Sequence, residues 1–169
     1  LASDLARTGG RVITLAFATG ECGDENWGGV GGAMLASANL VALQEAGLRY
    51  VISTGGAAGA FTCASDAGMK TFIERWRSPG LIGVDFDIEA GQSQSDIAAL
   101  IARIKAAHET YPALRFSLTL ATFASSADGS DSARSLGRAA TNNLNAIGTQ
   151  SLELVRKLLG WSDASTWPK

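Results

Sequence analysis

Three carboxylates stand at every second position of one apolar segment of the chain. They are Asp85, Asp87 and Glu89, and one apolar side chain separates each acid from the next. Successive side chains of a β-strand point to opposite faces, so this spacing predicts a row of acids on one face, with about 7 Å between neighbours. Three negative charges in a buried strand are costly unless they share protons or serve chemistry. The row is therefore the strongest candidate for a catalytic site.

A repeated strand and helix pattern predicts the scaffold for these acids. β-branched and apolar runs predict strands over residues 11–19, 49–53, 81–89 and 114–122. Apolar residues at helical spacing predict helices over residues 33–46, 66–76 and 94–109, and further helices from about residue 128 to 160 and from Ser162. Four βα units in series predict one α/β domain over residues 1–169 with a parallel sheet and right-handed crossovers. Chain order alone fits either a doubly wound sheet or part of an eight-stranded barrel.

The position of each acid on its strand suggests a role for it. Functional groups of parallel α/β sheets gather at the carboxyl ends of the strands. Glu89 ends its strand and is expected to meet substrate, Asp87 lies between two acids and is expected to hold or relay a proton, and Asp85 lies deeper and is expected to tune Asp87. The alternatives are a solvated row and a Mg²⁺ or Ca²⁺ site. No companion acid at another strand end supports the metal site, so no metal is expected.

Composition excludes two classes of partner. The chain has 169 residues, a net charge of −2 and an isoelectric point near 5.4, so it lacks the basic surface of a nucleic-acid-binding protein. Its apolar fraction is 46%, but no stretch approaches the roughly 20 apolar residues of a membrane span. No signal-peptide pattern opens the sequence.

Two motifs resemble those of a known enzyme family. Residues 83–89, Gly-Val-Asp-Phe-Asp-Ile-Glu, resemble the D-G-x-D-x-D-x-E signature of family-18 glycoside hydrolases, the chitinases. Residues 53–56, Ser-Thr-Gly-Gly, match the S-x-G-G signature that this family carries one strand earlier, and residues 27–29, Trp-Gly-Gly, resemble bacterial members. The resemblance covers about residues 11–123. It implies a TIM-type barrel, of which this chain resembles strands two to five, a half barrel.

The resemblance implies a role for each residue of the site. Glu89 would be the general acid that protonates the glycosidic oxygen, Asp87 would orient and polarise the N-acetyl group of the substrate, and Asp85 would be the buried partner of Asp87. The implied reaction is retaining, substrate-assisted hydrolysis of β-1,4-linked N-acetylglucosamine polymers without a cofactor. Chitin and its oligosaccharides are the implied partners.

For the other residues of the motifs we expect a packing role, or leave packing and substrate binding open. Ser53, Gly55 and Gly56 are expected to pack the strand end close beneath the acids. Trp27 could stack on a sugar ring, and core packing is the alternative.

The chain departs from the family pattern at three places. Ile82 stands where the signature has its first Asp. The family expects a tyrosine on the sixth barrel strand, and neither Tyr50 nor Tyr111 has that context. It also expects a tryptophan at the last strand, which neither Trp161 nor Trp167 matches. These departures leave two alternatives to chitin hydrolysis, a lectin-like binder of N-acetylglucosamine polymers and an endo-β-N-acetylglucosaminidase.

The cysteines and the strand edges complete the expectations. Cys22 and Cys63 follow the first two predicted strands, so their loops lie above adjacent strands, and either a disulfide or two buried thiols fits this placement. A disulfide is typical of a secreted protein. A half barrel has two exposed edge strands, which favour a homodimer.

Overall fold

A four-stranded parallel sheet forms the centre of the molecule. The computed structural model describes residues 9–89 and 92–120, and the helices predicted beyond residue 120 lie outside these ranges. The strands are β1 (Val12–Ala18), β5 (Arg49–Gly55), β7 (Leu81–Ile88) and β8 (Arg115–Leu120), in the order β1-β5-β7-β8. Every neighbouring pair is parallel. The predicted strand bounds hold to within two residues.

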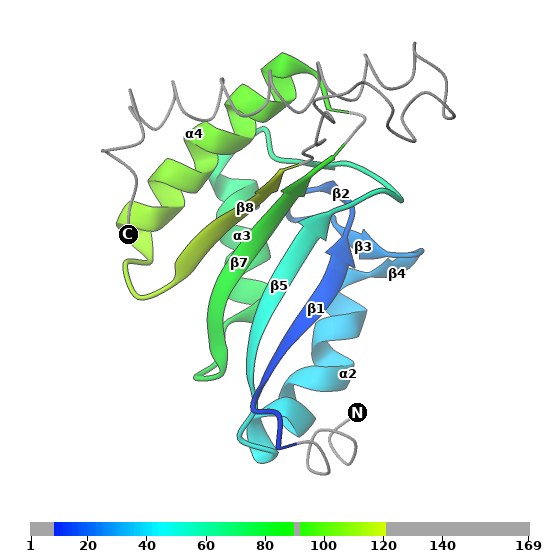
Figure 1. Cartoon of the computed structure of the whole chain (residues 1–169), viewed down its shortest axis with the longest axis vertical. Helices are drawn as coiled ribbons and strands as arrows, with labels where there is room; N and C mark the ends of the chain where they lie inside the picture. Colours follow the sequence, from blue (N-terminus) through cyan, green and yellow to red (C-terminus); the bar gives the residue numbers. More distant parts are fainter. Residues whose placement is uncertain (1–8, 90–91, 121–169) are drawn as a thin grey trace, which may run out of the picture.

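The connecting helices all lie on one face of this sheet. Figure 1 shows α2 (Gly32–Glu45), α3 (Asp66–Trp76) and α4 (Gln94–Thr110) behind the strands. Strand order in space follows chain order without reversal, so the described sheet has no switch point of the doubly wound kind. The structure therefore decides for barrel-type βα units. The described strands form an open sheet that ends at β1 and β8, which confirms the expected partial barrel.

Local sequence explains where the helices begin. The Ser65 side chain accepts a hydrogen bond from the Gly68 N–H at the start of α3, and Ser93 forms a capping box with Asp96 at the start of α4. Both helices then bury one apolar stripe against the sheet. The buried residues of α4 are Ile97, Leu100, Ile101, Ile104 and Ala107.

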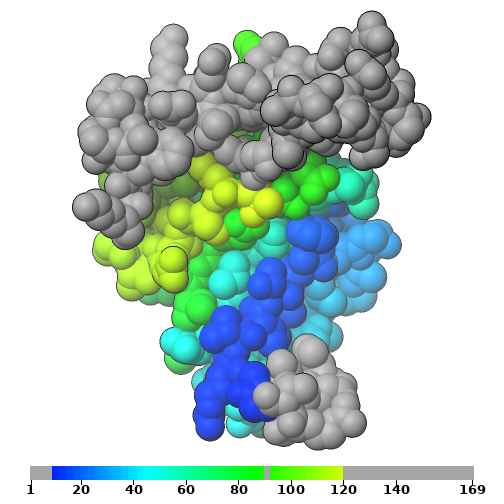
Figure 2. Space-filling model, viewed as in Figure 1, coloured from blue at the N-terminus to red at the C-terminus, as the bar shows by residue number. Residues whose placement is uncertain are grey.

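The two faces of the sheet differ in chemistry. The face toward the helices is apolar, with Ile52, Val84 and Phe86 each at most 1% exposed. The opposite face carries none of the helices in the described ranges; this helix-free face faces the viewer in Figure 2. Side chains on that face include hydroxyls and acids from all four strands: Thr14, Ser53, Asp85, Asp87, Ser117 and Thr119. The fold thus separates the core from a polar surface on the same strands.

Two small strand pairs lie above the carboxyl ends of the main strands. β2 (Gly20–Glu21) pairs with β6 (Phe61–Thr62), and β3 (Asn26–Trp27) forms a hairpin with β4 (Val30–Gly31). Strands of two residues have no alternation to detect, so the sequence did not predict them. A disulfide joins Cys22 to Cys63 beside the first pair, with 4.9 Å between the Cα atoms. None of the helices in the described ranges is long and apolar enough to cross a membrane.

Candidate functional site

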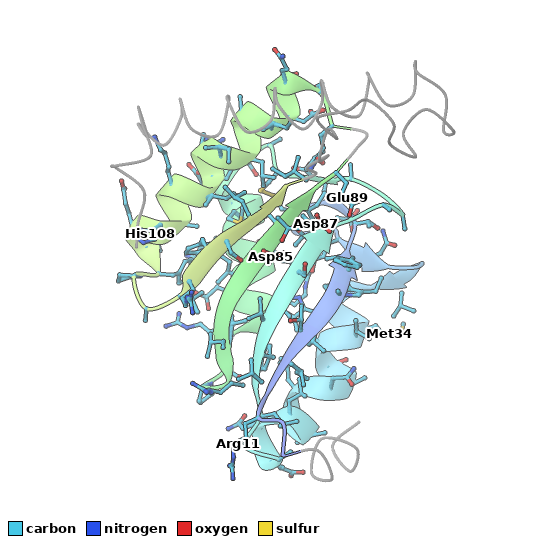
Figure 3. The ribbon with its side chains drawn as sticks, in the orientation of Figure 1. Arg11, Met34, Asp85, Asp87, Glu89 and His108 are labelled. Atoms are coloured by element: carbon cyan, nitrogen blue, oxygen red, sulfur yellow. A yellow bond between two sulfur atoms is a disulfide. The ribbon has the colours of Figure 1, made fainter. Side chains whose placement is uncertain are left out.

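The three acids form one row along β7 and just beyond its end. Figure 3 shows Asp85, Asp87 and Glu89 in succession toward the carboxyl end of the strand. Asp87 is the least exposed of the three, at 7%, whereas Asp85 and Glu89 are half-buried. The order of the acids along the strand is as predicted, whereas Asp85 is less buried than the resemblance implied. This residue faces the helix-free side of the sheet, where the described strands leave it partly open.

Hydroxyl groups of both neighbouring strands surround the carboxylate of Asp85. Ser53 on β5 donates to Oδ2 at 3.0 Å, and Ser117 on β8 donates to Oδ1 at 2.6 Å. The Thr119 hydroxyl lies 3.2 Å from Oδ1 and 3.1 Å from Oδ2. Both oxygens are therefore engaged as acceptors. Hydrogen bonds from three side chains fix the orientation of this carboxylate.

Asp87 has the opposite environment. Its Oδ1 atom is buried and has no hydrogen-bond partner among the described residues. Burial, the neighbouring charges of Glu89 and Asp85, and a hydrogen bond with Glu89 together raise the pKa of Asp87 to about 6. A carboxyl group with this pKa holds or releases a proton near neutral pH. Asp87 can therefore exchange a proton with Glu89.

The two glycines of the S-x-G-G motif allow β5 to approach the acid row. Gly55 has φ +85°, and a Cβ atom there would overlap the carbonyl oxygen of Asp87. Gly56 has φ +79°, and its N–H donates to the same carbonyl oxygen at 3.1 Å. Only glycine adopts this conformation and permits this approach. Both residues thus have a packing role beneath the acids, while Ser53 also donates a hydrogen bond to Asp85.

Sequence reasoning missed Phe17 at the carboxyl end of β1. This ring is 46% exposed and lies against Gly56, where a Cβ atom would come within 3.3 Å of it. An exposed aromatic face beside a row of acids can stack on a sugar ring. The signal was an aromatic residue among the small residues that end a predicted strand.

The structure favours the packing role of Trp27 over the substrate-binding role. Its ring lies 5.0 Å from that of Trp76 on α3, with 59° between the planes. Trp27 is one of the partly buried apolar residues that pack against the core between sheet and helices. Phe17 replaces it as the aromatic candidate of the site.

Near the disulfide, three potential metal ligands come together. They are Glu21, Cys22 and Cys63. Both sulfur atoms are bonded to each other, and the Glu21 carboxylate accepts hydrogen bonds from the Thr62 hydroxyl and the Ala64 N–H, each at 2.6 Å. This group therefore does not form a metal centre.

Both tyrosines of the chain lie away from the acid row. The buried Tyr50 donates to the Trp76 carbonyl oxygen at 2.5 Å, and Tyr111 at the end of α4 donates to Glu74 at 2.9 Å. Neither takes the place of the tyrosine expected on a later barrel strand. Trp161 and Trp167 lie outside the described residues.

Comparisons with known proteins report a likeness in fold. No protein-family model matches the chain, and no curated protein sequence matches it. The structure is similar to the catalytic domain of a hyperthermophilic chitinase from Pyrococcus furiosus, with a TM-score of 0.55 and 24% identity over 70% of this chain and 41% of that one. It is similar, with a TM-score of 0.54 and the same identity and coverage, to catalytic-site mutants of active domain 2 of a thermostable chitinase from Pyrococcus furiosus in complex with chito-oligosaccharides.

These findings establish the fold and its extent. The described sheet has the architecture of part of a chitinase catalytic domain, in agreement with the resemblance in the two sequence motifs. The chain spans less than half the length of these structures.

Proposed function

We propose that this chain carries the acid half of a family-18 type active site and hydrolyses β-1,4 bonds between N-acetylglucosamine units. The observation that carries the proposal is the ordered row on β7. Its outermost acid is Glu89, its middle acid has a pKa of about 6, and its innermost acid is fixed by hydroxyls. In the proposal, Glu89 is the acid, Asp87 is its proton partner, and Asp85 is a carboxylate of fixed orientation.

In the proposed reaction Glu89 donates its proton to the glycosidic oxygen as the bond to the anomeric carbon breaks. The acetamido oxygen of the same sugar attacks that carbon from the opposite face and forms an oxazolinium ring. Glu89, now a carboxylate, takes a proton from the water that opens this ring. Two inversions give a product with retained configuration.

Asp87 is suited to guide the acetamido group. One of its oxygens shares a hydrogen bond with Glu89, and Oδ1 has no partner among the described residues. A turn of the buried Asp87 side chain toward the sugar would let Oδ1 accept the acetamido N–H, which turns the acetamido oxygen toward the anomeric carbon and stabilises the positive charge of the ring. Phe17 offers an apolar face for a sugar next to this position.

The test is turnover of chitooligosaccharides by Glu89→Gln. We expect a loss of at least about 100-fold in kcat, the usual contribution of a general acid. Glu45→Gln is the matched control, because Glu45 is exposed at the last residue of α2, far from the row. Equal loss in both variants, or full activity of Glu89→Gln, refutes the assignment.

A lectin-like function is the second candidate. One observation favours it: both tyrosines of this chain lie away from the acids. Calorimetric titration with chitooligosaccharides, run beside the turnover assay, separates the candidates. Binding without product supports the lectin-like function, and binding with product supports hydrolysis. An endo-acting enzyme on N-glycan cores would instead release sugar from a glycoprotein.

We propose an extracellular location, which the disulfide between Cys22 and Cys63 supports. The homodimer stays a prediction, and the two edge strands of the described sheet, β1 and β8, are where we expect a partner.

A further inference from the structure

The described hydroxyl groups on the helix-free face of the sheet form hydrogen bonds to Asp85 but not to Oδ1 of Asp87. Ser53 and Ser117 are the register partners of Asp85 on the flanking strands. Thr119 is the register partner of Asp87, yet its hydroxyl lies within hydrogen-bond distance of both oxygens of Asp85. Asp87 Oδ1 receives no hydrogen bond from any described residue. Thr119 is therefore paired with Asp87 in the sheet, but its hydroxyl binds Asp85.

Among the residues that the structure describes, few other charges face these acids. On β7 and its end, Asp87 and Glu89 accompany Asp85, and on β8, Arg115 lines the same hollow of about 360 Å³ as Asp85. The described inner-face residues of β1 and β5 that line this hollow, Thr14 and Val51, carry no charge. The hydroxyls are thus the groups that determine how Asp85 is oriented.

We propose that Ser117 and Thr119 are positioning residues for the hydrolysis. By filling the acceptor positions of Asp85, they prevent this carboxylate from taking the proton of Asp87. Asp87 is then left to share its proton with Glu89. The catalytic part of this inference rests on the proposed function, whereas the placement of the proton does not require turnover.

Removing a hydroxyl has a defined direction of effect. In a variant without the hydroxyl, the carboxylate of Asp85 has one hydrogen-bond donor fewer. Asp85 and Asp87 together then bind a proton more tightly, whichever of the two carries it. A proton held between these two acids is withdrawn from Glu89. We expect substrate binding to change little, because both hydroxyls bond to Asp85. The rate should therefore fall more than the affinity.

The experiment compares Thr119→Val with Thr119→Ser, which keeps the hydroxyl, and with Ser117→Ala. Thr14→Val is the matched control, since Thr14 is exposed on the same face two strands from the row. Carboxyl ¹³C NMR follows the titration near pH 6 in each folded protein. We expect an upward shift of at least about half a unit in Thr119→Val and Ser117→Ala, and none in Thr119→Ser or Thr14→Val.

Kinetics on chitooligosaccharides give the second readout. We expect Thr119→Val to lower kcat about tenfold, the rate equivalent of one lost hydrogen bond to a charged group, with KM within about twofold. Thr119→Ser should recover most of this loss. An unmoved titration in both Thr119→Val and Ser117→Ala overturns the inference. A shifted titration in a protein without turnover supports the placement of the proton and overturns only the proposed hydrolysis.

Discussion

Asp87→Asn should make the stability of the protein less dependent on pH. The pKa of Asp87 is about 6 in the folded protein against an ordinary value of 3.8, because the side chain is buried beside two other acids. Between these values the folded state holds a proton that the unfolded state has released. The stability that this proton contributes is complete below about pH 4 and is lost as pH rises through 6. Asparagine carries no such proton, so the variant lacks this loss.

The size of the effect follows from the difference of about 2 pKa units. Each unit corresponds to about 1.4 kcal/mol, which gives about 3 kcal/mol as the upper value. Asp87 titrates together with its neighbours Asp85 and Glu89, which share the shift, so we expect about 1–3 kcal/mol. The free energy of unfolding of Asp87→Asn minus that of the wild type should rise by this amount from pH 4 to pH 7.

Urea unfolding followed by tryptophan fluorescence measures this difference at each pH. Asp24→Asn is the control, because Asp24 is exposed and lies outside the row. Its difference from the wild type should stay constant from pH 4 to pH 7. A flat profile for Asp87→Asn, or a difference that falls with pH, would refute the account of Asp87 as a proton-holding acid.

Two further substitutions test the packing that positions the site. Gly55→Ala should destabilise the fold by about 3 kcal/mol, because φ is +85° and the new Cβ atom overlaps a carbonyl of β7. Gly31→Ala is the control, because Gly31 has open space around it, and it should cost less than about 1 kcal/mol. Urea unfolding measures both. Arg75→Met should lower the free energy of unfolding by about 3–5 kcal/mol, because it leaves the fully buried Glu25 carboxylate without its ion-pair partner. Arg77→Met removes an exposed ion pair and should barely move the thermal transition. Equal effects within either pair would contradict these assignments.

The elements of the fold could be read from sequence because each has a local signal. Ser65 and Ser93 precede the two helices that they cap, and glycine or proline follows the predicted ends. The alternation of Asp85, Asp87 and Glu89 placed all three on one face. What decided between barrel-type and doubly wound sheets was strand order in space, which no local pattern contains.

The hydrogen-bond partners of the acids could not be predicted from local sequence patterns. Ser117 and Thr119 lie 32 and 34 residues after Asp85, and only the register of β8 on β7 brings their hydroxyls to it. How far Asp85 is buried could not be predicted for the same reason, since burial depends on what covers that face of the sheet. For Trp27 the sequence left sugar stacking and core packing open, because its contact with Trp76 depends on how the hairpin folds over α3.

The central claim is that Glu89 drives retaining hydrolysis with the acetamido group as nucleophile. The most direct measurement is ¹H NMR of the anomeric protons during the first minutes of chitooligosaccharide cleavage, with wild type, Glu89→Gln and Glu45→Gln in parallel. We predict that the β-anomer forms first with the wild type and Glu45→Gln, and that Glu89→Gln gives no product on this timescale. An α-anomer formed first, or β-product from Glu89→Gln at the wild-type rate, would contradict the claim.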